Sequence, residues 1–372
     1  MTGWDKFDAY LHSTLKDCII IPNRGPHDIT ETDKEVIVDT TCGMAILRGA
    51  HVYKNGIIGA PHSLRADDTV SVYADLEGKC LKGTTVYSGM KVLVGNGISQ
   101  VSRSDIFNSN TSRRGIGILM TEPIFQAPSL SDLNLDWVVP QNLPSIVCVH
   151  VLDPKQGETI LDMCAAPGGK TSHIAALMEN TGRIVALDKS QKRALLMERF
   201  KTPNMEIYTF DATHAVLADA VLTGGPPYPP ASFDRILVDA PCSALGQRPS
   251  FINNITLKQL QSFPVIQHQL LLTAVKLLKP GGVIVYSTCT VTKEENEDQV
   301  SRLLAKCPEI RLLSTPWRGA GADYDCDLTN EQRSQVLRFD PYNITADPTH
   351  IVSCDYDTIG FFIAKFQKDF VL

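Results

Sequence analysis

The chain has 372 residues, of which 43% are hydrophobic and 20% are charged, and its net charge at pH 7 is −6. At roughly 150 residues per domain, this length predicts two or three domains. The negative charge excludes a protein that binds nucleic acid through an overall basic surface. No apolar run approaches the ~20 residues of a membrane span, and no signal-peptide pattern opens the chain, so we expect a cytoplasmic protein.

The ten cysteines contain no C-x-x-C motif, and no two of them lie closer than 16 residues apart. This spacing fits neither a zinc knuckle nor a small domain held by disulfides. We therefore expect no metal site, and reduced thiols in a reducing compartment.

The first 125 residues are predicted to be rich in short strands. Residues 1–32 contain one candidate, Cys18 to Pro22. Residues 33–125 contain short apolar runs separated by Gly and Asp turns, which predict strands at 36–38, 57–58, 70–73, 86–87 and 91–95. Such spacing favours a small β-barrel or sandwich over helices. A stretch punctuated by prolines, 123–144, marks the boundary to the next domain.

Residues 126–372 alternate between strand and helix patterns. Strands are predicted at 159–162, 183–188, 206–210, 235–239 and 283–286, and helices at 171–179, 189–200 and 257–278. This alternation predicts an α/β domain, a doubly wound parallel sheet with helices on both faces. The apolar segment 360–366 is expected to be a late antiparallel strand at the edge of this sheet.

A glycine-rich loop follows the first strand of this domain and opens a helix. It reads Cys164-Ala165-Ala166-Pro167-Gly168-Gly169-Lys170. Asp188 ends the next strand, 20 residues beyond Gly168, where a carboxylate can bind ribose hydroxyls. Asp211 follows a third strand and can bind an adenine or amino group. Neither G-x-G-x-x-G nor a P-loop motif is present. These residues predict a site for S-adenosylmethionine. The alternative is a plain turn followed by acids that cap helices.

Two cysteines lie just after predicted strands. Cys242 closes Asp239-Ala240-Pro241-Cys242, and Cys289 closes Ser287-Thr288-Cys289. A thiolate can add to carbon 6 of a pyrimidine and so make carbon 5 nucleophilic, and a second group can then assist loss of the carbon-5 proton. Two thiols beside a cofactor loop therefore predict methylation of a pyrimidine carbon. The alternative is a pair of buried structural thiols.

These motifs resemble the catalytic domain of the Sun-type RNA cytosine-carbon-5 methyltransferases. The matching runs are CAAPGGKTSHIAALM, DAPCSALG and YSTCT, with QNLPS, LLKPGG and GFFIAKF, and they span about residues 140–372. The resemblance implies a class I S-adenosylmethionine-dependent fold. It also implies that Cys289 is the nucleophile, that Cys242 assists product release, that Asp239 activates the cytosine, and that Lys170 assists electrostatically.

The resemblance leaves one assignment open and has two departures. DNA cytosine methyltransferases use the thiol of the Pro-Cys motif as nucleophile, so position alone does not assign the roles. The family usually has Gly where this chain has Ala244, which is expected to stiffen the loop behind Cys242. The helix between Asp188 and Asp211 is short for the family.

Residues 33–125 resemble a PUA domain, a small RNA-binding β-barrel. The runs that carry this likeness are 36–38, 47–52, 56–57 and 68–72, with Asp67-Asp68 in place of the usual Gly-Asp turn. RNA-binding barrels use aromatic groups and a few cations near phosphates. The candidates here are Arg48, Tyr53, Lys82 and Arg103, for which ordinary solvated surface is the alternative.

A PUA barrel joined to this catalytic domain resembles one subfamily, the tRNA methyltransferases that modify cytosine 72 of the acceptor stem. The resemblance implies that the barrel holds the CCA end. Family members carry a longer N-terminal extension, so we expect the 32 residues before the barrel to be a truncated or reduced form of it. Two alternatives remain: an inert RNA-binding scaffold, and a DNA cytosine methyltransferase, which the Thr-Cys motif and the barrel oppose.

Overall fold

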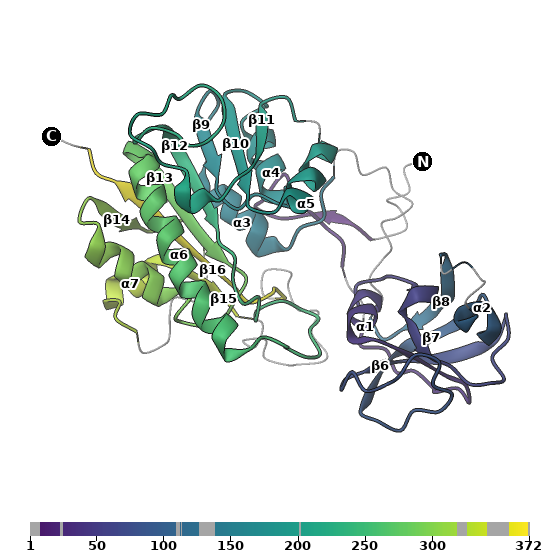
Figure 1. Ribbon diagram of the computed structural model, residues 1–372. Helices are drawn as coiled ribbons and strands as arrows, with labels where there is room; N and C mark the ends of the chain where they lie inside the picture. The colour runs from purple at the N-terminus through teal and green to yellow at the C-terminus, as the bar shows by residue number, and fades with distance from the viewer. Residues whose placement is uncertain are drawn as a thin grey trace. The chain divides into compact units, whose positions relative to one another are not determined.

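The computed structural model describes residues 8–22, 25–108, 112, 114–125, 138–200, 202–317, 326–340 and 357–370. The chain divides into two compact units (Figure 1). The N-terminal unit comprises residues 1–134 together with 249–254, and the C-terminal unit comprises 135–248 and 255–372. Much of the predicted boundary stretch, 126–137, lies outside the described residues. In the part of the chain that is described, no helix is both long and apolar enough to cross a membrane.

The N-terminal unit is built on a six-stranded sheet with the order β4-β8-β7-β6-β3-β5. Its strands are β3 (Glu35–Val38), β4 (Val52–Tyr53), β5 (Ile57–Gly59), β6 (Thr69–Asp75), β7 (Lys91–Ser99) and β8 (Ile116–Pro123). A separate two-stranded sheet pairs β1 (Tyr10–Leu11) with β2 (Ile19–Ile20). Fully buried β-branched side chains such as Val36, Val70 and Val72 form the core of the six-stranded sheet, because such side chains pack well on a pleated surface.

Two predictions for this unit were wrong. Residues 86–87 are not a strand; instead the Tyr87 hydroxyl donates to Asp75 Oδ1 at 2.7 Å and holds the loop before β7. Helices are also present: α1 (Thr40–Ile46), α2 (Arg103–Phe107) and a single 3₁₀ turn, η2 (Lys54–Gly56). The N-cap Asp39, which accepts from Cys42 N at 2.7 Å, was the available sequence signal for α1.

Residues 249–254 belong to the N-terminal unit although they follow Cys242 in the chain. Phe251 packs against the core of the six-stranded sheet. A Cβ at Gly43 would lie 3.0 Å from the Phe251 ring, so the absence of a side chain there leaves room for this aromatic group. The domain limits predicted from the sequence did not include this excursion.

The C-terminal unit is built on an eight-stranded sheet with the order β11-β10-β9-β12-β13-β16-β14, and β15 also pairs with β16. From β11 to β13 all neighbours are parallel, whereas β16 is antiparallel to β13, β14 and β15. The strands are β9 (Thr159–Asp162), β10 (Arg183–Asp188), β11 (Met205–Thr209), β12 (Phe233–Asp239), β13 (Leu278–Thr288), β14 (Ile310–Leu313), β15 (Leu337–Phe339) and β16 (Phe361–Lys368). This confirms the doubly wound α/β prediction.

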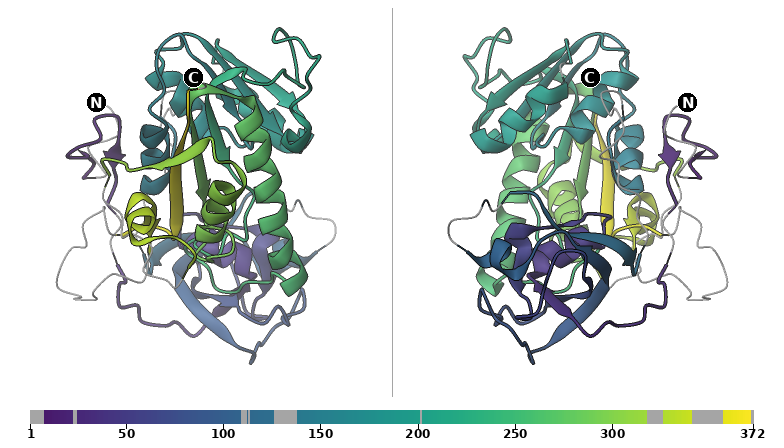
Figure 2. Two further views of the ribbon diagram at one scale, coloured as in Figure 1. Left: turned by 90° about the vertical axis from the view of Figure 1, so that its left-hand side faces the viewer. Right: turned by 90° about the vertical axis from the view of Figure 1, so that its right-hand side faces the viewer.

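Helices cover both faces of this sheet. They are α3 (Leu143–Leu152), α4 (Gly169–Leu177), α5 (Gln191–Ala194), α6 (Leu257–Leu277), α7 (Glu297–Lys306) and α8 (Asn330–Gln335), with 3₁₀ turns η3 (Leu195–Phe200) and η4 (Ala212–His214). The two side views show α3 on one face and α6 on the other (Figure 2). The strand order reverses between β9 and β12, so ligands are expected at the carboxyl ends of these strands.

The prediction that residues 360–366 form an edge strand was wrong. The segment is antiparallel, but β16 lies inside the sheet, between β13 and β14. Phe362, Ile363 and Ala364 are fully buried. A run that is apolar at every position, rather than at alternate positions, is typical of a strand that is buried on both faces.

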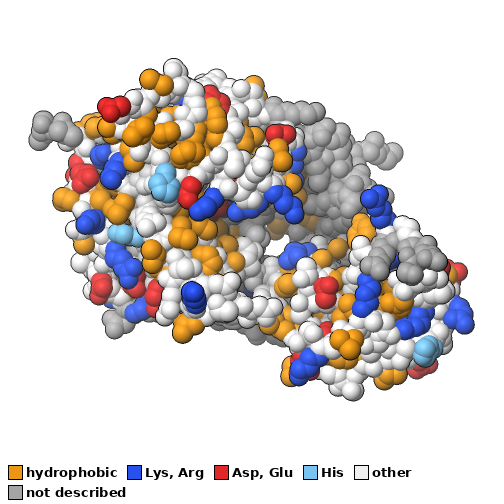
Figure 3. All heavy atoms as spheres, in the orientation of Figure 1, with side chains coloured by type: hydrophobic (Ala, Val, Ile, Leu, Met, Phe, Trp, Pro, Cys, Tyr) orange, Lys and Arg blue, Asp and Glu red, His pale blue; other side chains and the backbone are white. Residues whose placement is uncertain are grey.

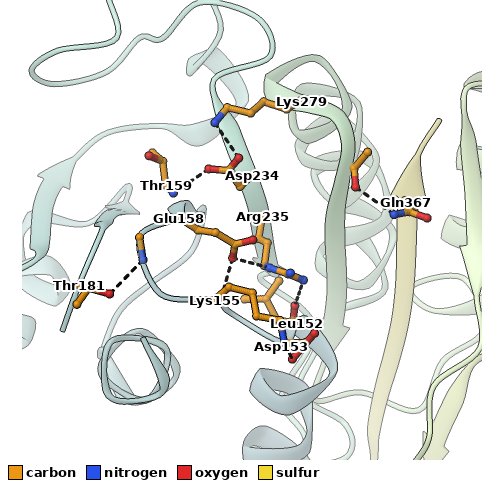
Figure 4. Close-up of polar contacts among 12 residues, drawn as sticks. Leu152, Asp153, Lys155, Glu158, Thr159, Thr181, Asp234, Arg235, Lys279 and Gln367 are labelled. Atoms are coloured by element: carbon orange, nitrogen blue, oxygen red, sulfur yellow. Dashed lines mark hydrogen bonds and ion pairs between the residues drawn. The ribbon is translucent and has the colours of Figure 1, made fainter. Parts of the chain in front are cut away.

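Charged side chains are paired at the amino ends of β9 and β12 (Figure 4). Arg235 Nε donates to Glu158 Oε2 at 2.6 Å. Asp234 accepts from Lys279 Nζ at 2.8 Å and from the amide of Thr159 at 2.9 Å. These contacts tie the starts of the central strands together on the edge opposite to their carboxyl ends.

Candidate active site

The glycine-rich loop joins the carboxyl end of β9 to α4. The amide of Ala165 donates to the Leu187 carbonyl of β10 at 2.8 Å, which fixes the loop to the neighbouring strand. Gly168 has a φ of 100°, and a Cβ there would lie 2.6 Å from the Phe200 ring. Glycine is therefore needed at this N-cap position for both conformation and space. Two residues of the loop itself, Ala165 and Ala166, are buried.

Two of the predicted cofactor acids lie at the expected strand ends. Asp188 is 4% exposed, and its carboxylate accepts from Ser190 N at 2.9 Å and from Ala166 N at 3.3 Å. Asp211 follows β11 and accepts from Lys189 Nζ at 2.7 Å. Partial burial alone would raise the pKa of Asp211, but hydrogen bonds from Lys189 and Thr213 outweigh it and lower that pKa to about 2. The structure thus brings Asp188 against the loop itself.

A third acid at this edge, Asp162, escaped the sequence prediction. It ends β9, is almost completely buried, and accepts from Thr171 Oγ1 at 2.8 Å and from Cys164 N at 3.3 Å. Burial raises its pKa to about 7. Cys164 is partly buried and packs against the hydrophobic core, and burial raises its pKa well above the usual range, so this thiol contributes packing. A strand-end acid directly before the loop was the signal that could have identified Asp162.

Lys170 and Asp239 form an ion pair at the carboxyl ends of β9 and β12. Lys170 Nζ lies 2.8 Å from Asp239 Oδ2, and the ammonium also lies 5.3 Å from the centre of the Phe361 ring. Burial alone would lower the pKa of Lys170, but the charge of Asp239 outweighs it and raises that pKa. Ser287 Oγ donates to the other oxygen, Oδ1, at 2.8 Å. Both carboxylate oxygens are therefore held in place.

Ser287 is a second residue that sequence reasoning did not single out. It lies directly opposite Asp239 in the pairing of β12 with β13, so the register of two strands creates the contact. It is fully buried, and nothing in the tripeptide Ser287-Thr288-Cys289 reveals this partner by itself.

The two thiols meet at the ends of adjacent strands. Cys242 follows β12, Cys289 follows β13, and their Sγ atoms lie 3.4 Å apart. The contact with Cys242 lowers the pKa of Cys289 to about 7, despite its burial, and the charge of Lys170 acts in the same direction. The same contact and burial raise the pKa of Cys242 strongly. Both shifts favour loss of the first proton from Cys289, with the Cys242 thiol donating a hydrogen bond to its sulfur.

The loop after Cys242 is packed tightly against its neighbours. Gly246 N donates to the Cys289 carbonyl at 3.0 Å, and Gly360 N donates to the Gly246 carbonyl at 2.8 Å. A Cβ at Gly246 would lie 2.1 Å from the Gly360 carbonyl oxygen. Ala244 has a φ of 56°, the left-handed conformation that favours glycine. This conformation explains the glycine that is usual at that position in the resembling family.

The candidate RNA-binding residues of the N-terminal unit differ in exposure. Tyr53 is 58% exposed, and Arg48 and Lys82 are also exposed. Arg103 is half-buried: its guanidinium donates to the carbonyls of Gly83 (2.5 Å) and Ala60 and packs over a phenylalanine ring. Arg103 therefore holds the loop before β7 against the sheet, and its prediction as an RNA contact loses support.

Comparison with known proteins agrees with this arrangement. Residues 149–367 match the family described as 16S rRNA methyltransferase RsmB/F. The chain is 47% identical to tRNA (cytosine(72)-C(5))-methyltransferase NSUN6 of Mus musculus, over 98% of this chain and 81% of that protein. Identity to the NSUN6 of Homo sapiens is 44%, over 96% and 80%. A crystal structure of NSun6 from Pyrococcus horikoshii with SFG has a TM-score of 0.78 at 32% identity and covers 98% of this chain and 85% of that one. The Sun-type resemblance is thereby confirmed, and the chain belongs to the RsmB/F family of S-adenosylmethionine-dependent RNA cytosine-carbon-5 methyltransferases.

Proposed function

We propose that this chain methylates carbon 5 of cytosine 72 in the acceptor stem of tRNA through a covalent adduct on Cys289. The observation that carries the chemistry is the contact between the Cys242 and Cys289 thiols, 3.4 Å apart, beside the Lys170–Asp239 ion pair. The named activity of the mouse and human relatives supports the tRNA substrate and the position. A base at a fraying acceptor end costs less to unstack than one within a long duplex.

S-adenosylmethionine fits the chemistry of the loop at the ends of β9 and β10. The buried Asp188 carboxylate is suited to ribose hydroxyls, and Asp211 is suited to the adenine or amino group. The backbone from Cys164 to Lys170 and the Asp239 carboxylate complete the proposed cofactor site. A Cβ at Gly169, unlike one at Gly168, would make only ordinary contacts, 3.7 Å from Gln141 and 3.8 Å from Val139. The cofactor, when bound, supplies an electrophilic methyl group.

In this proposal Cys289 acts as a thiolate near neutral pH and adds to carbon 6 of cytosine, which makes carbon 5 nucleophilic. Asp239 accepts a hydrogen bond from the cytosine, and its orientation is maintained by Lys170 and Ser287. The negative charge on Cys289 disappears once its sulfur bonds to carbon. The main cause that raises the pKa of Cys242 is then removed. Once carbon 5 carries the methyl group, Cys242 can lose its proton to solvent and accept the carbon-5 proton as a thiolate, after which the Cys289 sulfur leaves carbon 6 as a thiolate.

The test is a denaturing gel of wild type, Cys242→Ala and Cys289→Ala, each incubated with tRNA and S-adenosylmethionine. We expect a band of protein bound covalently to RNA in Cys242→Ala only. A band in Cys289→Ala only would reverse the two roles. No band together with no methyl transfer by wild type would favour the inert scaffold, and a parallel incubation with duplex DNA tests the DNA methyltransferase alternative.

The N-terminal sheet is proposed to be a PUA-like barrel that contacts the tRNA acceptor and CCA end through Arg48, Tyr53 and Lys82. On the visible face of this unit, Lys and Arg side chains are separate rather than gathered in one basic field (Figure 3). Such a surface fits a few phosphate contacts rather than nonspecific binding. A reducing cytoplasm would keep the cysteines in the form that catalysis requires.

Lys82→Glu tests the barrel's role. We expect weaker tRNA binding in a filter assay, a salt dependence reduced by about one phosphate contact, and unchanged affinity for S-adenosylmethionine. The matched control is Lys155→Glu, the same charge change at an exposed lysine of the other unit. Equal tRNA affinity of the two variants would contradict this assignment.

A further inference from the structure

A buried carboxylate lies behind the Cys242 thiol. Glu295 is fully buried and stands in the segment between β13 and α7. Its Oε2 accepts from the amide of Ser243 at 2.9 Å, and its Oε1 accepts from the Ser243 hydroxyl at 2.5 Å. Both oxygens of one side chain therefore hold the residue that immediately follows Cys242.

The same carboxylate is tied to a helix and to the segment that follows Cys289. Gln267 Nε2 of α6 donates to Glu295 Oε2 and to the Pro241 carbonyl, both at 2.9 Å. Thr292 Oγ1 donates to Glu295 Oε1 at 2.9 Å, and the hydroxyls of Ser243 and Thr290 lie 2.6 Å apart. Cys242 is thus held on its two sides, at Pro241 and at Ser243, by groups that converge on Glu295.

The far side of Glu295 is anchored to the sheet that carries Cys289. The Tyr286 hydroxyl of β13 donates to the backbone carbonyl of Glu295 at 2.6 Å. The neighbouring Asn296 accepts from Thr288 Oγ1 at 2.5 Å and donates to the Thr290 carbonyl at 3.1 Å. These donors and acceptors flank Cys289 at positions 288 and 290. A displacement of Glu295 would therefore be transmitted to both thiol loops.

We propose that Glu295 is a positioning residue that fixes the Cys242 loop against the Cys289 loop and so sets the contact between the two sulfur atoms. It touches neither thiol and acts through Ser243, Gln267 and Thr292. The consequence for catalysis rests on the proposed function: a displaced Cys242 would no longer assist loss of the carbon-5 proton, and the covalent adduct would accumulate.

Four donors reach the side-chain carboxylate of Glu295, and they differ in which replacement side chain could satisfy them. The backbone amide of Ser243 and the NH₂ of Gln267 donate, whereas the hydroxyls of Ser243 and Thr292 can also accept. Glu295→Gln can keep an oxygen toward the amides and turn its NH₂ toward the hydroxyls. Glu295→Met has similar length but offers no acceptor, so it leaves buried donors without a partner. We therefore expect Glu295→Gln to disturb the position of the Cys242 loop mildly and Glu295→Met to disturb it severely.

The first readout needs neither RNA nor methyl transfer. The rate of alkylation of Cys289 by iodoacetamide, followed by mass spectrometry of its peptide, reports the thiolate fraction across pH. In Glu295→Met the pKa of Cys289 should rise by at least one unit, which lowers its alkylation rate at pH 7 by about fivefold. In Glu295→Gln the curve should stay near that of wild type. An unchanged curve in Glu295→Met would overturn the proposal.

The matched control is Glu297→Gln. Glu297 is equally buried and lies two residues along the chain, but its carboxylate pairs with Arg338. We expect this variant to lose thermal stability and to keep the alkylation curve of wild type. If Glu295→Met does not fold, Gln267→Leu removes one donor and should shift the curve less and in the same direction. A shift of equal size in Glu297→Gln would show that general loosening of the fold is the cause, and would overturn the proposal.

The second readout is the covalent adduct with tRNA and S-adenosylmethionine. Glu295→Met should accumulate the adduct with both thiols intact, whereas Glu295→Gln should turn over. If Cys242→Ala gives no adduct, the proposed function fails, while the alkylation curves still test the position of the thiols. If Cys242→Ala gives the adduct and Glu295→Met does not, the positioning role in catalysis is wrong.

Discussion

The two edges of the catalytic sheet are built from the same strands but satisfy their charges differently. At the amino edge, Glu158 faces Arg235, and Asp234 faces Lys279, so each acid meets a cation directly (Figure 4). At the carboxyl edge, Asp239 also meets a cation, Lys170, but Asp162 and Glu295 are buried and bound by hydroxyl and amide donors instead. The amino edge is arranged for stability. The carboxyl edge also holds Asp162 and Cys289, each with a pKa of about 7, and perturbed pKa values are typical of functional sites.

The largest effect that separates the two edges is expected from Cys289→Ala. Loss of the nucleophile should lower kcat by a factor on the order of 10³ or more. Binding of S-adenosylmethionine, measured by calorimetry, should survive because the acids that are proposed to hold adenosine are untouched. An equal loss of cofactor affinity would count against the assignment of Cys289 and would place its thiol in the cofactor site.

The pH dependence should reflect the lowered pKa of Cys289, about 7. The reactive form is deprotonated, so kcat/KM should level off well above pH 7 and fall about tenfold per pH unit well below it. Asp162 titrates in the same range, so the alkylation rate of Cys289 is the direct measurement. In Cys242→Ala the curve should move to higher pH, because the contact that lowers the pKa is gone. If the alkylation curve of Cys289 in Cys242→Ala matches that of wild type, Cys242 does not lower the pKa of Cys289.

At the amino edge we expect a substitution to change the free energy of unfolding while kcat stays the same. Glu158→Gln leaves the mostly buried Arg235 without its partner and should cost about 2 kcal/mol, between the values for exposed and fully buried pairs. The control is Lys155→Met, which breaks the exposed pair with Asp153 and should cost less than about 0.5 kcal/mol. Thermal melts and kcat of both variants provide the measurement. A loss of kcat at a temperature where Glu158→Gln is folded would show that the two edges are coupled.

The smallest effect is expected at Ala244. Its left-handed backbone conformation is strained for alanine, so Ala244→Gly should raise the free energy of unfolding by roughly 0.5–1 kcal/mol. Chemical denaturation measures this change. A loss of stability would mean that the unfolded-state entropy of glycine outweighs the relief of strain.

The parts of the site that lie on single strands were predictable from the sequence. The bounds 159–162 and 183–188 were confirmed, because apolar runs that end in an acid mark the carboxyl ends of parallel strands. The contact of Ser287 with Asp239 was not predictable, because it depends on register between two strands. The bonds of Glu295 were also hidden, since they join segments about 30 to 50 residues apart. The residue pattern of one segment does not show which residue of another segment it will contact.

The position of β16 has a consequence for biosynthesis. This strand, Phe361–Lys368, comes after every other described strand in the sequence, yet it lies inside the sheet and pairs with β13, β14 and β15. During translation β13 would expose an open edge, and β14 would have no strand beside it among the described elements, until these residues left the ribosome. Phe361, which underlies the Lys170 ammonium, would arrive at the same moment. The nascent chain is therefore expected to complete its catalytic edge only after these residues have been synthesised, and a chain that stops before Phe361 would leave an open sheet prone to association.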